Sequence, residues 1–433
     1  MTRGLAIVAA LAACRGAAPA HRSGSAAPVE IVNQPALPDA APAAGTSEEI
    51  EPNDTDDVAT PLPIGGTVRG KIEPDGDVDR YRIDVPKGGP GELAVTVSGV
   101  DQDLILEIAD DGGNVIARSA RGGVRVAEGV PNLGVTPGRY TAIVRLAPAR
   151  KKPVKGRSRR PEPAKPAPVY EITAKAVTRA RDAEQEPDDD RGTANELLSN
   201  DSATGYIGWS GDQDVYVLST ELLSAKNVVA VEVSPVEGVA LELEVDDAIG
   251  QPLAIRKGAR GDGVALHGLA PVIAQGAPPF VYFVVRGDRS NLETSYTIKT
   301  TASVPDVDAE TEPDDTPEHP FEISPDRATV HATWDFGDVD CFAVPVAAAE
   351  HEVELAFATP AELDLAAELF VDGKSVAKVD HPGKGVPEKV GAVIPAGSHA
   401  VACVHAVGDA PGHGTVKYDV HVSESGGAGD NAP

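Results

Sequence analysis

Three short acidic motifs recur along the chain, and their side chains are of the kind that binds a metal ion. Each motif reads Glu-x-Glu-Pro-Asn/Asp-Asp and is followed, after 21 further residues, by Gly-Asp-x-Asp. In every copy 26 positions separate the second Glu from the first Asp of Gly-Asp-x-Asp, as between Glu51 and Asp77. The copies begin at residues 49, 184 and 310, so they are 135 and 126 residues apart although their internal spacing is constant. This constancy predicts that the two acidic groups of each repeat meet in the fold.

The donor atoms of the motifs are carboxylate oxygens and one amide oxygen, and neither His nor Cys recurs among them. Hard oxygen donors favour calcium over zinc or copper, and magnesium prefers fewer carboxylates because it keeps several of its waters. Two bare carboxylates about 4 Å apart repel each other by roughly 1 kcal/mol in water and more inside a protein. No Lys or Arg recurs within the motif to offset this repulsion. We therefore expect bound Ca²⁺ in each repeat; the alternative is that the acids only form turns. The predicted ligands are Glu49, Glu51, Asn53, Asp54, Asp77 and Asp79, then Glu184, Glu186, Asp188, Asp189, Asp212 and Asp214, and finally Glu310, Glu312, Asp314, Asp315, Asp338 and Asp340.

The backbone that carries these ligands is expected to be extended. A residue that precedes proline is displaced from the helical region, and this applies to Glu51 and its two counterparts. Residues two apart on an extended chain point to the same side, so Glu49 and Glu51 can present their oxygens together. Gly-Asp-x-Asp leads into a strand in which Tyr81 and Ile83 alternate with polar residues, as a half-buried strand requires.

Short alternating segments between Gly- and Pro-containing turns predict an all-β fold. The 433 residues include 44 Gly and 37 Pro, which favours many short strands over long helices. We predict three tandem antiparallel β-sandwich domains, at residues 48–180, 181–303 and 304–424. The strands predicted for the first are Thr67–Glu73, Asp79–Val85, Glu92–Ser98, Leu104–Ala109, Asn114–Arg118, Arg139–Leu146 and Val169–Val177.

Three further segments are predicted to lie outside the sandwiches. Residues 14–47 are rich in Ala and Pro and are expected to form a flexible, disordered tether, and residues 425–433 a disordered tail. The first repeat also contains a basic, Pro-rich segment, 148–168, that the other repeats lack. We interpret it as an extended loop insertion. The alternative is a contact with anionic lipid, with polysaccharide or with the protein's own acidic clusters.

The N-terminus resembles a bacterial lipoprotein signal. An apolar run after Arg3 is too short to cross a bilayer and fits a signal-peptide core, so residues 1–13 are predicted to be a signal peptide. The run ends in Leu-Ala-Ala-Cys, which resembles a lipobox and makes Cys14 the predicted lipidation site; the alternative is an ordinary secretory signal. The residue after Cys14 is Arg15 rather than Asp, and by resemblance to lipoprotein sorting rules this predicts the outer membrane. We expect an extracytoplasmic protein of the cell envelope, attached to the membrane by its N-terminal lipid.

Two further cysteines, Cys341 and Cys403, form an even pair in an oxidising compartment and are candidates for a disulfide. Whether the two cysteines lie on the same side of the sheet cannot be decided from the alternation of inward and outward positions, so the disulfide is left open. Cys341 lies opposite the core-facing Phe342, whereas Cys403 aligns with Val144, an inward position of the first repeat.

The order of these motifs resembles the bacterial pre-peptidase C-terminal domain family, to which the collagen-binding modules of clostridial collagenases are similar. The resemblance covers about 370 residues and includes the aromatic residue after Gly-Asp-x-Asp and a late strand that begins Gly-x-Tyr or Gly-x-His. It implies a jelly-roll-like sandwich in each repeat, with calcium held by the two acidic segments and ordering the stretch between domains. The chain departs from the family at Asp188 and Asp314, where Asn is usual, and has neither a peptidase nor an assignable collagen-binding platform.

Composition and motifs narrow the function. A net charge of −29 argues against nucleic acid as a partner, because a phosphate backbone requires a basic face. We find no nucleophile elbow, zinc-protease motif or phosphate-binding loop, and predict no catalysis. We expect a calcium-stabilised lipoprotein that acts as a binding, adhesion or spacer array toward a polysaccharide or protein surface ligand. The alternative is an accessory or regulatory subunit that targets or restrains a separate secreted peptidase.

Overall fold

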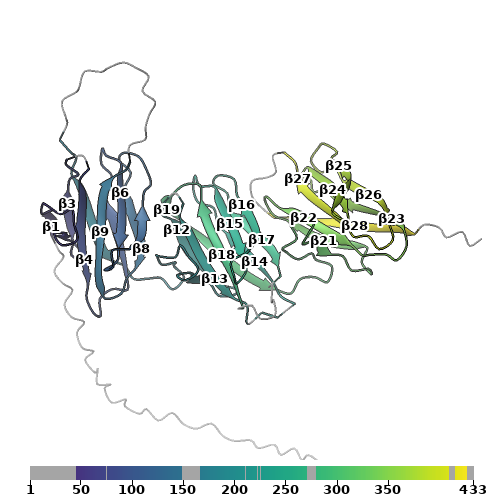
Figure 1. The fold of residues 1–433 in the computed structure, drawn as a ribbon, viewed down its shortest axis with the longest axis horizontal. Coiled ribbons are helices and arrows are strands. Elements are labelled where there is room, and N and C mark those ends of the chain that lie inside the picture. The colour runs from purple at the N-terminus through teal and green to yellow at the C-terminus, as the bar shows by residue number, and fades with distance from the viewer. Residues whose placement is uncertain are drawn as a thin grey trace, which may run out of the picture. The chain divides into compact units, whose positions relative to one another are not determined.

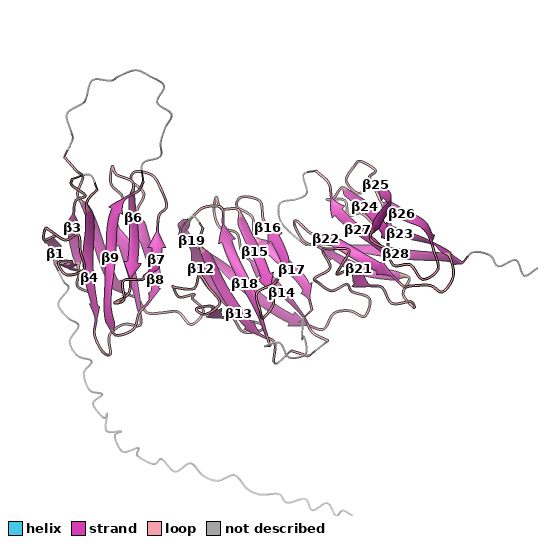
Figure 2. Ribbon diagram, in the orientation of Figure 1, coloured by secondary structure: helices cyan, strands magenta, loops and turns pink. Residues whose placement is uncertain are grey.

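The computed structural model describes residues 45–74, 76–148, 166–209, 211–221, 223–224, 226–270, 279–408 and 415–426. Every regular element among them is a β-strand, which confirms the all-β prediction (Figure 2). Figure 1 labels the strands along the chain. The strands form six sheets, and the buried apolar side chains form three separate clusters. The described residues include no helix long and apolar enough to cross a membrane. The predictions for the signal peptide, for lipidation of Cys14 and for most of the tether and basic segment fall outside the described residues.

The first repeat contains two five-stranded sheets, in the orders β1-β3-β10-β5-β8 and β2-β4-β9-β6-β7. Most neighbouring strands are antiparallel, but β1 pairs with β3 and β2 with β4 in parallel. β1 begins inside the segment predicted to be tether, and β8 was not predicted. The strands are β1 Thr46–Glu48, β2 Thr60–Pro61, β3 Thr67–Gly70, β4 Val78–Val85, β5 Glu92–Val97, β6 Leu104–Ala109, β7 Val115–Ser119, β8 Glu128–Gly134, β9 Gly138–Leu146 and β10 Tyr170–Ala176.

The second repeat pairs a four-stranded sheet, β12-β19-β14-β17, with a five-stranded sheet, β11-β13-β18-β15-β16. The short β11 is again a parallel edge strand, paired with β13. The strands are β11 Asn195–Glu196, β12 Ser202–Ile207, β13 Gln213–Ser219, β14 Val228–Val233, β15 Leu241–Asp246, β16 Pro252–Lys257, β17 Val264–Leu269, β18 Phe280–Gly287 and β19 Asn291–Ser303.

The third repeat has the same plan, with sheets β21-β28-β23-β26 and β20-β22-β27-β24-β25. Its last strand extends into the segment predicted to be a tail. The strands are β20 Phe321–Glu322, β21 Thr329–Trp334, β22 Val339–Val344, β23 His351–Phe357, β24 Leu365–Val371, β25 Lys374–Val379, β26 Glu388–Ile394, β27 Ala400–Ala406 and β28 Val416–Gly426.

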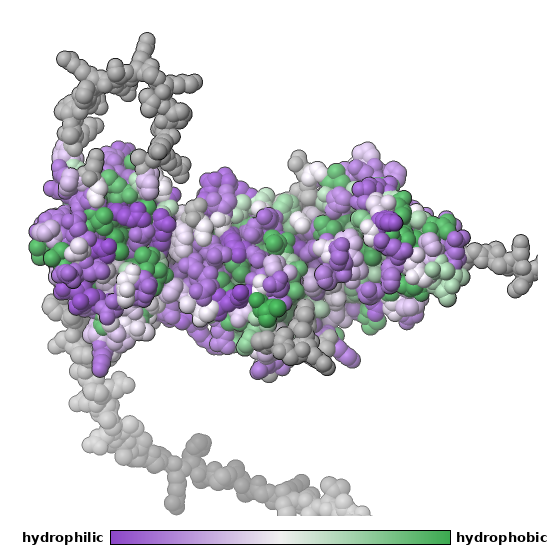
Figure 3. All heavy atoms as spheres, viewed as in Figure 1, coloured by the Kyte–Doolittle hydropathy of each residue, from purple (hydrophilic) through white to green (hydrophobic). Residues whose placement is uncertain are grey.

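Alternation along the strands places one face of each sheet in the core. On β4, Tyr81, Ile83 and Val85 are buried as predicted, and equivalent strands contribute Tyr216 and Phe342 to the other cores. Hydrophilic side chains interspersed with apolar ones cover the face drawn in Figure 3. Each Å² of apolar surface removed from water stabilises the fold by about 25 cal/mol. Burial of the apolar face of its sheets therefore stabilises each sandwich around its own core.

Cys341 and Cys403 face each other across β22 and β27 and form a disulfide. The strand parity predicted for Cys403 was wrong by one position. Asp79 pairs with Val144 and Asp340 pairs with Val404, so Val404 and not Cys403 matches the inward Val144. Both cysteines consequently lie on the same side of their sheet, because directly opposed residues of antiparallel strands point the same way.

Candidate metal centres

In every repeat the two acidic segments lie together, as the constant spacing predicted. The leading motif runs beside the turn that precedes β4, β13 or β22. In each case the residue after the last Asp of Gly-Asp-x-Asp donates its backbone N–H to a backbone carbonyl oxygen of the motif. The pairs are Arg80 to Asn53, Val215 to Asp188 and Cys341 to Asp314, at 3.1–3.2 Å. The convergence therefore follows from main-chain pairing, which does not depend on side-chain charge.

Five groups of three carboxylates have oxygens that all lie within 4.8 Å of one another. The first repeat has one group, and the second and third repeats have two each. Asp214 belongs to both groups of the second repeat, and Glu312 to both groups of the third. The groups are Glu49, Glu51 and Asp79; Glu184, Asp188 and Asp214; Glu186, Asp212 and Asp214; Glu312, Asp315 and Asp338; and Glu312, Asp314 and Asp340.

Five predicted ligands fall outside these groups of three: Asn53, Asp54, Asp77, Asp189 and Glu310. All five still lie close by. Burial raises the pKa of Glu51, and the charges of Asp77 and then Asp54 add to the effect; the charge of Asp189 acts on the pKa of Glu186 in the same way. Asn53 is buried with its amide oxygen unpaired within the described chain, and so is one oxygen of Glu310. Asp54 is exposed.

The clusters of the second and third repeats are buried, unlike that of the first, where Glu51 is exposed. Burial, followed by the charge of Glu186, raises the pKa of Asp188 to about 11. Burial also raises the pKa of Glu186 to about 8, with the charges of Glu184 and Asp189 adding to the effect. In the first repeat burial raises the pKa of Asp79 to about 8. Without a counter-charge these carboxyl groups would therefore hold protons near neutral pH.

Many of the buried carboxylate oxygens accept no hydrogen bond from the described part of the chain, although buried polar atoms are nearly always paired. Most of the unpaired carboxylate oxygens belong to the same clusters and include both oxygens of Asp314; Glu92, Asp246 and Asp364, outside the clusters, have one each. Those in the clusters are Asp79 Oδ1, Glu186 Oε2, Asp188 Oδ1, Asp212 Oδ1, Asp214 Oδ1, Glu310 Oε2, Asp314 Oδ1 and Oδ2, and Asp340 Oδ1. A hard divalent cation would satisfy such oxygens and offset their mutual repulsion. The residues present in these clusters thus fit a metal ion.

The last strand of each sandwich supplies a tyrosine that was not predicted from the sequence. Tyr170, Tyr296 and Tyr418 each donate a hydrogen bond to the last Asp of Gly-Asp-x-Asp. Partners of this kind orient metal ligands and tune them. A sequence signal exists, because each tyrosine opens a Tyr-x-Ile or Tyr-x-Val triplet near the end of its repeat.

A second tyrosine joins the network in two repeats. Tyr81 and Tyr216 donate to Glu49 and Glu184, at 3.0 and 2.9 Å, and each hydroxyl also contacts that of the last-strand tyrosine. The third repeat has Phe342 at this position, so Glu310 lacks this donor.

Neighbouring repeats also contribute to the second and third clusters. Glu186 forms a parallel bridge with Leu133 of β8, and Glu312 forms one with Leu269 of β17. Asn132 Nδ2 donates to Glu184 Oε1 at 2.9 Å. Each of these two motifs is therefore paired on one side with the repeat before it.

The third cluster contains a cation that the motif pattern does not predict. Arg256 on β16 is 1 % exposed, and its guanidinium lies 2.7 Å from Glu312, 3.0 Å from Asp315 and 2.5 Å from Asp338. The motif itself carries no recurrent Lys or Arg, as the sequence indicated. The counter-charge comes instead from the preceding repeat.

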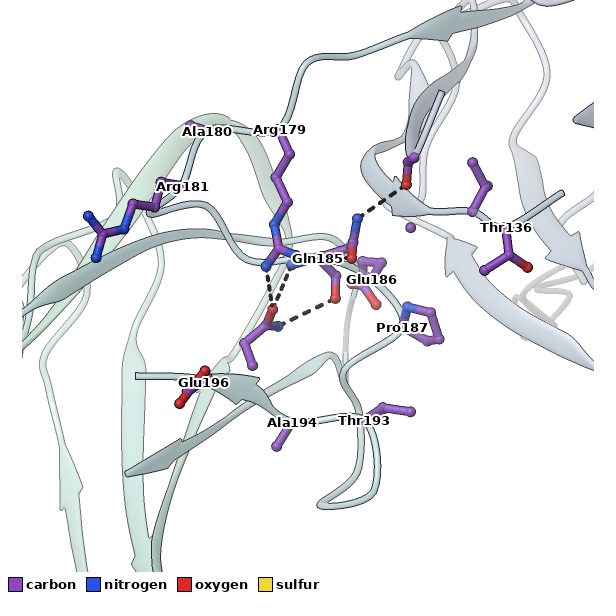
Figure 4. Close-up of a pocket in the computed structure, with 14 residues that line it drawn as sticks. Thr136, Arg179, Ala180, Arg181, Gln185, Glu186, Pro187, Thr193, Ala194 and Glu196 are labelled. Carbon is purple, nitrogen blue, oxygen red and sulfur yellow. Dashed lines mark hydrogen bonds between the residues drawn. The ribbon is translucent and has the colours of Figure 1, made fainter. Parts of the chain in front are cut away.

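A cavity of about 690 Å³ opens beside the motif of the second repeat (Figure 4). At its wall Arg179 donates to Gln185 and to Asn195. Asn195 donates in turn to Asp188 at 2.7 Å. Thr60 and Phe321 occupy the position of Asn195 in the other repeats. Phe321 has no side-chain donor, so Asp314 lacks the partner that Asp188 has.

Comparison with known proteins gives structural likeness only. No family model matches the chain, and no curated protein matches it. Among solved structures, the pre-peptidase C-terminal domain of a collagenase from Bacillus anthracis is 16% identical, with 25% of this chain and 94% of that chain covered and a TM-score of 0.18. A protein from Eubacterium rectale described as secreted is 10% identical, with 58% of this chain and 81% of that chain covered and a TM-score of 0.20. A triple jelly-roll protein of an archaeal virus is 8% identical, with 81% and 84% covered and a TM-score of 0.20.

Proposed function

We propose that the chain is a non-catalytic, calcium-stabilised array of three pre-peptidase C-terminal-like repeats. The observation that supports this most is the set of buried, unpaired carboxylate oxygens in the acidic clusters. Calcium is the ion that suits them, because it accepts six to eight oxygen ligands in flexible geometry. Its bound charge would hold together a motif, the turn before the central strand and, through the motif, the edge of the preceding repeat.

The array would serve binding or spacing at the cell envelope. The lipobox-like sequence supports attachment through Cys14, and Arg15 supports the outer membrane. The tether would hold the repeats away from that surface, where a polysaccharide or protein could be the ligand. The net charge of −29 supports a partner other than nucleic acid.

Calorimetry on metal-free protein, with calcium then added, tests the proposal. An ion present at about one hundred times its dissociation constant adds roughly 2.7 kcal/mol per site to the free energy of unfolding. We expect the melting temperature to rise with calcium and to rise less with magnesium at the same concentration. An unchanged melting temperature, together with no calcium retained after dialysis, would refute calcium binding.

Attachment is tested separately. Cys14→Ser should abolish labelling with radioactive palmitate and release the chain from the membrane fraction, whereas Cys403→Ser should do neither. Palmitate labelling that persists in Cys14→Ser would overturn the assignment of the lipid anchor.

A further inference from the structure

The third cluster can be divided into two halves that differ in the charges facing them. We call Glu312, Asp315 and Asp338 the outer group and Glu310, Asp314 and Asp340 the inner group. Glu312 also lies within 4.8 Å of Asp314 and Asp340, and Glu310 is assigned to the inner group because its charge acts on both of these residues. Arg256 forms ion pairs with all three members of the outer group. In the inner group, Asp314 has two unpaired oxygens, and Glu310 and Asp340 have one each. All three inner side chains are more than nine-tenths buried.

The second cluster has the same two halves without a cation. Its outer group contains Glu186 and Asp212, and its inner group contains Glu184, Asp188 and Asp214. No Lys, Arg or His among the described residues lies within 4.0 Å of a carboxylate oxygen in either half. Unpaired oxygens occur in both halves, at Glu186 and Asp212 as well as at Asp188 and Asp214. The neutral Asn132 is the side chain that reaches this cluster from the first repeat.

The position of Arg256 can be matched in the other repeats by counting across the sheet from the last Asp of Gly-Asp-x-Asp. That Asp pairs with a residue on the adjacent strand of the sheet. The second residue pairs with one on the strand beyond, and the third pairs with one on the edge strand. The rows are Asp79–Val144–Leu106–Ser119, Asp214–Val285–Leu243–Arg256 and Asp340–Val404–Ala367–Val379. Ser119 and Val379 thus stand where the second repeat has Arg256.

The residue at this position differs among the three repeats in charge. Ser119 donates to Glu128 of its own repeat at 2.6 Å and adds no charge to the second cluster. Val379 belongs to the third repeat, after which the described chain has no further motif. Of the three matched residues, Arg256 alone is both charged and placed beside the acidic cluster of a following repeat.

We propose that Arg256 takes the place of one divalent cation, so that the third cluster binds one ion, at its inner group, whereas the second cluster binds two. This rests on the proposed function, since it assumes that the clusters bind a divalent cation. The guanidinium supplies a fixed positive charge to the outer group and, through its ion pairs, ties the third motif to β16. The third cluster then keeps a charged tie to the preceding repeat without metal, whereas the second cluster is tied to the first repeat only through the Leu133–Glu186 bridge and the neutral Asn132 among the described residues.

The first experiment counts bound calcium in the full chain by equilibrium dialysis with radioactive calcium. Arg256→Ser installs the residue found at the matched position of the first repeat. We expect this variant to bind one more ion per chain than the unmodified protein. Arg256→Lys keeps the charge and should bind the unmodified number. Arg260→Ser is the matched control, because it removes the same charge from the same repeat but from an exposed pair with Asp288.

The second experiment measures thermal unfolding without metal in a Trp209→Phe background, so that the intrinsic fluorescence comes from Trp334 in β21 alone. Metal-free Arg256→Ser should lose the third repeat at a lower temperature than unmodified protein, and calcium should restore more of the melting temperature in the variant. Circular dichroism in calcium verifies that the variant folds.

The outcomes separate the two proposals. An extra ion in Arg256→Ser but not in Arg260→Ser supports the inference. Equal calcium counts in Arg256→Ser and unmodified protein overturn it and leave the proposed function standing. If the unmodified chain binds no calcium, the proposed function is wrong. The inference that Arg256 replaces an ion is then wrong as well.

Discussion

The hydroxyl of Tyr296, on the last strand of the second repeat, donates a hydrogen bond to Asp214 and also lies 3.1 Å from Glu184. One side chain thus contacts an acid from each of the two segments that meet in the cluster. Because it comes from a third segment of the chain, it fixes both acids relative to the core rather than only to each other.

Removal of this hydroxyl should weaken metal binding. Loss of such an orienting partner typically lowers metal affinity about 10- to 100-fold. We expect Tyr296→Phe to raise the calcium dissociation constant of the second cluster by about this factor, measured by calorimetric titration. Tyr282→Phe, on β18 and outside the hydrogen-bond network of the cluster, is the control. An unchanged affinity in Tyr296→Phe would show that the tyrosine has a packing role only.

Asp188→Asn should have opposite effects with and without metal. The pKa of Asp188 is raised to about 11, by burial first and by neighbouring carboxylates second, so folding of the metal-free protein at neutral pH requires protonation of this side chain. The amide, which the first repeat already has at Asn53, needs no proton and should stabilise the metal-free form by on the order of 1 kcal/mol or more, since one pKa unit corresponds to about 1.4 kcal/mol. It should also weaken calcium binding, because a charged ligand is lost. Urea unfolding in metal-free buffer and in calcium measures both effects, with the exposed Asp182→Asn as control.

The stability of the metal-free protein should fall as pH rises. The carboxyl groups of Asp79 and Glu186 have pKa values raised to about 8, whereas an unfolded Asp or Glu titrates near 4. Between about pH 4 and pH 8 the folded state therefore binds more protons than the unfolded state, and stability decreases with pH. With saturating calcium the slope should nearly vanish above about pH 5, because the metal-bound folded state and the unfolded state then both keep these groups deprotonated. Melting temperatures at pH 5, 6, 7 and 8 test this, and metal-free stability that rises over this range would contradict it.

Gly70→Ala should destabilise the first repeat, and Tyr81→Phe should partly restore it. A Cβ at Gly70 would overlap the Tyr81 hydroxyl and lie 2.6 Å from Glu49 Oε2. The third repeat has Ala332 at the matched position and Phe342 in place of the tyrosine. Overpacking of this kind typically costs about 1–3 kcal/mol. A double-mutant cycle by calorimetry measures the coupling, and Gly91→Ala, where the added carbon meets nothing within 4 Å, is the control.

Reduction of the disulfide should destabilise the third repeat selectively. Cys341 and Cys403 are 62 positions apart, and closing a loop of this length stabilises a fold by roughly 4 kcal/mol in the chain-entropy account. Dithiothreitol should therefore lower the transition reported by Trp334 and leave the transitions of the other two repeats unchanged. A uniform decrease in all transitions would instead indicate that the three sandwiches unfold together.

The meeting of the acidic segments could be predicted because both belong to one repeat with a fixed internal spacing. The strand β4 could be predicted because Tyr81 and Ile83 alternate with polar residues over its whole length. β8 was missed because its sequence, Glu-Gly-Val-Pro-Asn-Leu-Gly, includes two glycines and a proline, which weaken any strand signal. The parity of Cys403 was misassigned because β9 and β27 are apolar on both faces, so their inward positions cannot be read from alternation.

Arg256 could not be predicted because its partners lie 56 or more positions away in the next repeat. Nothing in the local pattern of Pro252–Lys257 separates it from an ordinary surface arginine such as Arg260. Only the register of four strands places it beside the motif. The tyrosines were accessible in principle, since their triplets recur near each repeat end, but their contact with the acids depends on how the last strand pairs.

The parallel bridges from Leu133 to Glu186 and from Leu269 to Glu312 have a consequence for how the chain can be divided. A cut made just before a motif leaves the donor and acceptor groups of the upstream strand without their partner, and leaves the downstream acids open to solvent. Because β8 and β17 are edge strands held by β5 and β14, the piece that is chemically complete contains the whole of the preceding sandwich as well. Fragments of this protein made for crystallisation or binding studies should therefore overlap by one complete repeat.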